Sequence, residues 1–112
     1  MSEHPPGSLG FFRDHVPETG DALVGLIDTL YDECALDPKS RELVFLGIQA
    51  ALRLPRAIRV HVPRALAAGA TEDEILWAIT LALPNAGLNA VAEAFGVARE
   101  LLDELASAPD PD

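Results

Sequence analysis

Apolar residues recur at helical spacing through most of the chain. Pro17, favoured at the first position of a helix, and Glu18, suited to the first turn, predict a helix that runs to about Cys34. The apolar positions of this helix follow the three-to-four-residue spacing of one helix face: Leu23, Leu26, Ile27, Leu30 and Tyr31.

A second helix is signalled by Asp37 as N-cap and Pro38 at the first helical position, and it runs to about Leu52. After Glu42 this segment is apolar on nearly all sides, so we expect the helix to be buried. A third helix is predicted from Pro55 to Gly69.

Pro63 lies inside that third helix and should kink it just after His61. Residues 71–74, Thr-Glu-Asp-Glu, form a capping box that opens a fourth helix. Pro84-Asn85 ends it, and Asn85 can cap the next helix. This fifth helix runs from about Ala86 to Leu105, with these positions facing the core: Val91, Phe95, Val97, Ala98, Leu101 and Leu102.

No alternating apolar and polar run bounded by turns predicts a strand. The chain is therefore expected to be all-α, a single-domain bundle of about five to six helices over residues 11–106. Residues 1–10 are expected to be loose, and residues 107–112 to form a mobile tail.

Composition narrows the possible functions. The net charge of -10 argues against nucleic acid and anionic membranes as partners, and no apolar run is long enough to span a membrane. The first ten residues do not resemble a signal peptide, and the single Cys34 suits a reducing cytoplasm, where we expect the protein. One cysteine also excludes a Cys-x-x-Cys redox pair or a cysteine-based zinc site within one chain, and no metal or other cofactor is expected.

The candidate chemistry lies on the second and third helices. Glu42, Leu46, Gln49 and Arg53 fall on one face at spacings of four, three and four residues, and Arg64 follows His61 by one turn. A carboxylate and an imidazole can form a pair that fixes the tautomer of the ring and moves a proton near neutral pH. The alternatives are an ion pair between helices for Glu42 and an ordinary core or surface histidine for His61.

Four of the eight basic residues, Arg53, Arg56, Arg59 and Arg64, are clustered in an otherwise acidic chain. Arg53 is the stronger candidate for holding a substrate carboxylate, whereas Arg56 and Arg59 suit a solvated face with salt bridges. Asn89 can line a pocket or serve as a buried polar partner. Trp77 is expected to be core or a subunit contact, and Cys34 to be packed and inert.

Several stretches together resemble the carboxymuconolactone decarboxylase / alkylhydroperoxidase D-like family. They are Leu36 to Val44, His61, Ala65 to Ile75, Ala86-Gly87 and Ala94-Phe95. The resemblance covers about residues 17–105 and implies an all-helical fold that assembles as trimers or hexamers.

The resemblance also implies roles. Glu42 and His61 match the glutamate and histidine of the peroxidase branch, but Leu54 and Ala57 occupy its two cysteine positions. Thiol peroxidase chemistry is therefore not expected, since no thiolate stands where it must attack. The decarboxylase branch keeps the histidine without the cysteines. This chain departs from it at three positions that remodel the pocket wall: Trp77 for glutamate, Asn85 for tyrosine and Asn89 for proline.

These features favour a cofactor-free acid–base enzyme of the carboxymuconolactone decarboxylase type. It would decarboxylate, isomerise or move a proton on a small unsaturated acid, lactone or carbonyl compound. His61 and Glu42 would be catalytic, and the substrate would be bound by Arg53, Gln49, Arg64, Asn85 and Asn89. The alternative is a non-catalytic member that binds a ligand or serves as an assembly subunit.

Overall fold

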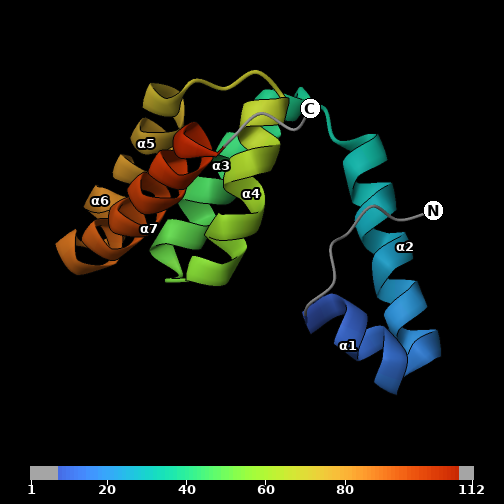
Figure 1. Cartoon of the computed structure of the whole chain (residues 1–112). Coiled ribbons are helices and arrows are strands. Elements are labelled where there is room, and N and C mark those ends of the chain that lie inside the picture. Colours follow the sequence, from blue (N-terminus) through green and yellow to red (C-terminus); the bar gives the residue numbers. More distant parts are fainter. Residues whose placement is uncertain (1–7, 109–112) are drawn as a thin grey trace. The chain divides into compact units, whose positions relative to one another are not determined.

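The computed structural model describes residues 8–108, which contain helices and no strand (Figure 1). The helices are α1 (Ser8–His15), α2 (Pro17–Glu33), α3 (Pro38–Ala51), α4 (Pro55–Ala67), α5 (Glu72–Thr80), α6 (Leu83–Ala86) and α7 (Leu88–Ser107). The all-α prediction is confirmed. The chain divides into two compact units, residues 1–35 and 36–112, and each is described by itself.

The ends of the chain differ in part from expectation. Helix α1 begins at Ser8, within the stretch expected to be loose, and α7 ends at Ser107, where the tail was expected to begin. The rest of both predictions, on residues 1–7 and 109–112, lies outside the described residues.

The first unit is a helix pair, α1 and α2, held by a close backbone approach. A Cβ atom added at Gly20 would lie 2.5 Å from the Cα of Arg13, so α1 can cross there only over a glycine. Arg13 and Asp21 form an exposed ion pair at 3.0 Å. Val24 is buried, whereas Leu26 and Leu30 are 63% and 54% exposed.

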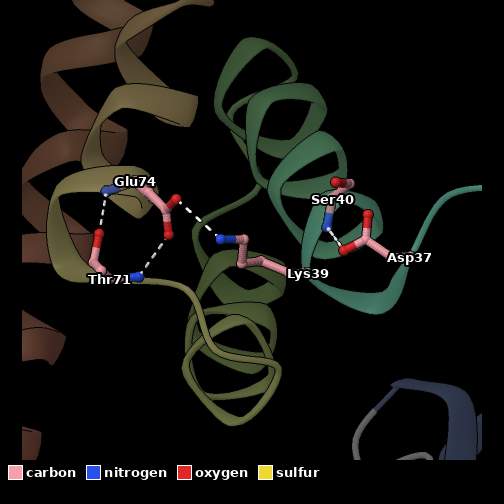
Figure 2. Close-up of polar contacts among 5 residues, drawn as sticks. All are labelled: Asp37, Lys39, Ser40, Thr71 and Glu74. Carbon is pink, nitrogen blue, oxygen red and sulfur yellow. Dashed lines mark hydrogen bonds and ion pairs between the residues drawn. The ribbon is translucent and has the colours of Figure 1, made fainter.

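The helices α3, α4 and α5 of the second unit begin where the local sequence signals predicted. Proline occupies the first turn of α3 and α4, and the Asp37 side chain accepts a hydrogen bond from the Ser40 N–H at 3.3 Å. Hydrogen bonds from Ser40, first its side chain and then its backbone, lower the pKa of Asp37. At α5 the predicted capping box is complete, with Thr71 Oγ1 3.0 Å from Glu74 N and Glu74 Oε1 2.9 Å from Thr71 N (Figure 2).

The start of the last helix was predicted wrongly. Helix α5 ends at Thr80, and Asn85 lies inside the short α6 rather than capping α7. The residue before α7 is Gly87, whose φ of 89° is open to glycine and strained for other residues. The backbone turn at Gly87 therefore sets the start of α7, and no side chain caps it.

The core of the second unit lies among α3, α4, α5 and α7, which pack against one another. The largest fully buried apolar side chains come from these four helices: Leu46, Ile58, Val62, Ile75, Ile79 and Leu102. On α7 the predicted core positions Val91, Ala98, Leu101 and Leu102 are buried, whereas Phe95 is 37% exposed. Ala90 and Ala94 are buried in its place, because the inward stripe of α7 follows these small residues.

Helix α3 is not buried on all sides as its composition predicted. Val44 and Ile48 are 48% and 50% exposed, and Leu52, which follows the helix, is 63% exposed. Trp77 on α5 is 61% exposed, so it is no part of this core. Among the described helices, none is long and apolar enough to cross a bilayer.

Candidate functional site

Helices α3 and α4 bring Glu42 and His61 together. His61 Nδ1 lies 2.6 Å from Glu42 Oε1, although the two residues are nineteen positions apart. The Glu42 side chain is 1% exposed and that of His61 is 15% exposed. Glu42 is in the first turns of α3 and His61 in the middle of α4, so the short connection between the two helices places them side by side.

Arg41 completes the surroundings of the carboxylate. Its Nε and a terminal nitrogen both lie 3.1 Å from Glu42 Oε2, the oxygen that does not face His61. A guanidinium can only donate hydrogen bonds, so this contact requires an acceptor oxygen. Both oxygens of the buried carboxylate are satisfied when it is ionised and Nδ1–H donates to Oε1. This tautomer leaves Nε2 of His61 as the basic nitrogen.

An aromatic ring supports the imidazole. Phe45, one turn after Glu42, packs edge-on against His61 with ring centroids 5.2 Å apart and an interplanar angle of 65°. Edge-to-face packing restricts the rotation of both rings. The imidazole is therefore held by a hydrogen bond at one nitrogen and by a ring contact from the same helix.

Gln49 lies on the Glu42 face of α3, two turns further on. It is 8% exposed, and its Oε1 is buried without a hydrogen-bond partner among the described residues. A buried acceptor without a donor is costly, by about 1–3 kcal/mol. Gln49 Oε1 is therefore a buried side-chain acceptor that the described residues leave without a donor.

Arg53 does not continue the helical stripe. It follows the end of α3 with a φ of 59°, in the left-handed region, and its Nε donates to Glu93 Oε1 at 3.1 Å. Its side chain is 54% exposed. Eleven residues at a rise of about 1.5 Å each separate it from Glu42 by roughly 16 Å along the helix axis. Arg53 thus lies at the opposite end of α3 from the carboxylate–imidazole pair.

The other predicted binding residues lie on different elements. Arg64 is half-buried on α4, one turn after His61. Asn85 is exposed in α6 and Asn89 is exposed in the first turn of α7. Neither asparagine side chain is hydrogen-bonded to Glu42 or His61 in the described part of the chain. Among residues 8–108, no group of three or more His, Cys, Asp or Glu side chains is placed to hold a metal ion.

The sequence pattern did not indicate a role for Arg41. Adjacent residues on a helix point in different directions, so helical spacing places Arg41 on another face than Glu42. The long guanidinium arm nevertheless reaches back to its neighbour. The available signal was the charge pair itself, a cation directly before the one carboxylate expected to be buried.

The profile of the carboxymuconolactone decarboxylase family matches residues 17–100 of this chain. This span includes Glu42, His61 and both helices that carry them. No match was found among curated proteins or among solved structures.

Proposed function

Because the chain belongs to the carboxymuconolactone decarboxylase family, we propose that it is a cofactor-free acid–base enzyme of that type. Its reaction would be a decarboxylation, an isomerisation or a related proton transfer on a small unsaturated acid, lactone or carbonyl compound. The observation that carries the proposal is the 2.6 Å contact between His61 Nδ1 and a carboxylate that is itself anchored by Arg41.

In the proposed mechanism His61 moves the proton. With Nδ1–H donated to Glu42, Nε2 takes a proton from the carbon beside a carbonyl, and the electron pair of the C–H bond passes into an enolate. The imidazolium then returns a proton to another carbon, which completes an isomerisation. In a decarboxylation His61 acts as the acid from the start, with a proton that Nε2 has taken from water. The C–C bond to the carboxylate breaks, carbon dioxide leaves, and the imidazolium protonates the remaining carbanion.

Glu42 and Arg41 act through the ring in this mechanism. Glu42 fixes the tautomer and stabilises the imidazolium that forms. Arg41 is a positioning residue, because it touches Glu42 rather than His61. Its contact keeps the second carboxylate oxygen from turning away from the pair.

Substrate binding is assigned to Arg53, Gln49, Arg64, Asn85 and Asn89. The support for Arg53 is its left-handed backbone, which costs a non-glycine residue roughly 1–2 kcal/mol and so favours a role for its side chain. Because Arg53 lies at the opposite end of α3 from the carboxylate–imidazole pair, it would hold a part of the substrate that is distant from the reacting carbon. A substrate carboxylate would there replace Glu93 as the partner of the guanidinium. The support for Gln49 is its orphaned oxygen.

The second candidate is a non-catalytic member that binds a ligand or serves as an assembly subunit. One observation favours it: a groove of about 390 Å³ in the second unit is lined by α3 and α5 and includes neither Glu42 nor His61. In that case the Glu42–His61 contact only joins α3 to α4. Thiol peroxidase chemistry is not proposed, because Leu54 and Ala57 stand at the family's two cysteine positions.

Deuterium exchange separates these candidates even before the substrate is identified. The full chain is incubated in D₂O with a panel of small unsaturated acids, lactones and ketones, and proton NMR follows each carbon-bound hydrogen. An acid–base enzyme is expected to speed exchange or conversion of at least one compound class. Saturable binding without exchange or conversion of any compound would support the second candidate.

The proposed setting is a homo-oligomer, a trimer or hexamer, in the cytoplasm. A chain of this length buries a modest share of its surface alone, and the single Cys34 suits a reducing compartment. No nucleic acid or membrane partner is proposed for a chain with a net charge of -10.

A further inference from the structure

The Gln49 side chain is a buried polar group that lacks a partner in the described part of the chain. Gln49 is 8% exposed, and its Oε1 atom is buried without a hydrogen-bond donor. Glu42 is also buried on α3, but both of its carboxylate oxygens are bonded. An unbonded buried acceptor destabilises the folded chain unless another group supplies the missing donor. Gln49 thus differs from Glu42 in needing a further donor.

Two contacts fix the position of Gln49 along the seam between α3 and α4. At one level His61 Nδ1 lies 2.6 Å from Glu42 Oε1, and at another the Leu54 N–H donates to the Gln49 carbonyl at 2.9 Å. Gln49 follows Glu42 by seven residues, and Leu54 precedes His61 by the same number. Seven residues of helix rise by roughly 10 Å, so the two contacts lie about 10 Å apart. Gln49 and the carboxylate–imidazole pair therefore belong to one seam.

Apolar side chains flank the line from Glu42 to Gln49. At about 100° per residue, Gln49 lies within roughly 20° of Glu42 around the helix axis. Leu46 is offset from Glu42 by about 40°, and Phe45 by about 60° in the opposite sense, so they lie on either side of the line. Leu46 is fully buried, and Phe45 packs against His61. A ligand along this line would meet polar groups at its ends and apolar groups between them.

The unpaired oxygen determines which kind of group would complete it. An amide oxygen only accepts hydrogen bonds, so its partner carries an O–H or an N–H. A cation would need more than one acceptor to offset its lost hydration, so the donor is uncharged. With a contact of about 3 Å at each end, the roughly 10 Å between Gln49 and the pair leave room for a chain of about three to six covalent bonds. An uncharged donor on a short apolar chain fits these conditions.

We propose that Gln49 is a specificity-determining residue and that the substrate carries a hydroxyl group about three to six bonds from its reacting carbon. The hydroxyl donates to Gln49 Oε1 while the reacting carbon lies at His61 Nε2. No hydrogen bond holds Oε1, so the amide can rotate toward an entering ligand. The inference rests on the proposed acid–base function and narrows its substrates to hydroxylated acids, lactones and carbonyl compounds. Such a site rejects compounds without the hydroxyl, because they leave its buried acceptor unpaired.

The test uses the full chain and 2-enoic acids of about four to eight carbons with a terminal hydroxyl, each paired with the acid in which a methyl group replaces that hydroxyl. In calorimetric titrations the wild type should bind the hydroxyl acid of the best length about ten- to hundredfold more tightly than its methyl partner. Gln49→Met should remove this preference, because a thioether is only a weak acceptor. Ile48→Met, at the half-exposed neighbouring position, is the matched control and should keep it.

Thermal unfolding of the free proteins gives a second measurement, which does not depend on any reaction. Gln49→Met should unfold at the same temperature as the wild type or a higher one, because it removes an unpaired buried group. Gln49→Leu has a shorter side chain and should behave alike, which guards against overpacking by methionine. A markedly lower unfolding temperature for both variants would mean that the free protein already supplies a donor, and it would overturn the proposal.

The remaining outcomes separate this inference from the proposed enzyme. Exchange that the wild type catalyses without preferring hydroxyl acids, or a preference that survives Gln49→Met, would overturn the substrate class and leave the acid–base function in place. Binding of hydroxyl acids that depends on Gln49 but leads to no exchange or conversion would overturn the enzyme and leave Gln49 as the binding residue. Hydroxyl acids that fail to bind the wild type at any length would overturn the substrate class.

Discussion

The two sides of α3 reverse the usual relation between burial and polarity. The buried side carries polar side chains, and the exposed side carries apolar ones. On the inner side Glu42 and Gln49 are 1% and 8% exposed, next to a fully buried Leu46. On the outer side Val44 and Ile48 are about half exposed. Burying a charge is costly unless it is paired, and exposed apolar patches mark contact surfaces. The inner side of α3 therefore buries polar side chains, whereas its outer side leaves apolar side chains about half exposed.

The buried ion pair at Glu42 also differs from the exposed ion pairs of the same unit. Glu42 is held by Arg41 and His61 within the packed helices, whereas Glu93 meets Arg53 with about half of each side chain in water. Arg59 likewise bridges Glu100 at 2.8 Å and Glu104 at 3.7 Å between exposed side chains of α4 and α7. Exposed pairs contribute little because water screens them, so the two kinds of pair should respond very differently to mutation.

The largest expected effect is on turnover. His61→Ala should lower the rate of the reaction identified in the deuterium-exchange panel by about 10²–10⁴-fold, because it removes the proposed acid–base group. His15→Ala, a histidine at the end of α1, is the control and should leave the rate unchanged. Near-normal turnover by a folded His61→Ala protein would show that His61 is not the acid–base group of the reaction.

A second test compares the two sides by packing. Leu46→Ala should reduce the free energy of unfolding by about 2–5 kcal/mol, since it opens a cavity at a fully buried position. Ile48→Ala, on the outer side, should cost well under 1 kcal/mol, because the side chain is already half in water. Both values come from urea unfolding at the same low protein concentration. Equal losses would show that the outer side is as well packed as the inner one.

A third test compares the buried carboxylate with an exposed one. Glu42→Gln leaves the guanidinium of Arg41 and Nδ1 of His61 facing a neutral amide, and it should cost about 1–3 kcal/mol of unfolding free energy. Glu93→Gln should cost less than about 1 kcal/mol. Urea unfolding of both variants gives the comparison. If the loss for Glu42→Gln is no larger than that for Glu93→Gln, the buried pair has no special energetic role.

The smallest expected effect concerns the cap of α5, which is formed by Thr71 and Glu74. Thr71→Ala should cost about 1 kcal/mol by removing the cap of α5. Hydrogen bonding from the Thr71 N–H, followed by that from Lys39, lowers the pKa of Glu74 below its ordinary value of 4.5. The stabilisation from Glu74 is therefore fully present above pH 4.5 and is lost as the pH falls through the lower folded-state pKa.

Glu74→Gln isolates this pH dependence. The difference in unfolding free energy between wild type and Glu74→Gln should be constant from pH 7 to about 5 and should shrink below pH 4.5. Thermal unfolding at each pH measures it. A difference that grows on acidification would contradict the assigned direction of the pKa shift.

The sequence by itself determined the helices and much of the inner side. Pro17, Pro38 and Pro55 were predicted to begin helices, as was the capping box at Thr71, and all four do so. These signals act within three or four residues, so no distant part of the chain is needed to interpret them. The pairing of Glu42 with His61 could be proposed because one was the polar residue at the start of an apolar helix and the other lay on the next helix.

Only the tertiary structure decided which side of each helix meets which neighbour. The apolar composition of α3 allowed no choice between a buried and an exposed side, and packing against α4, α5 and α7 left Val44 and Ile48 outside. Arg53 found its partner forty residues away at Glu93, and Arg41 found its partner beside it through the reach of its side chain. Such contacts depend on how distant helices cross and how far long side chains extend, and neither is encoded in the spacing of residues along one helix.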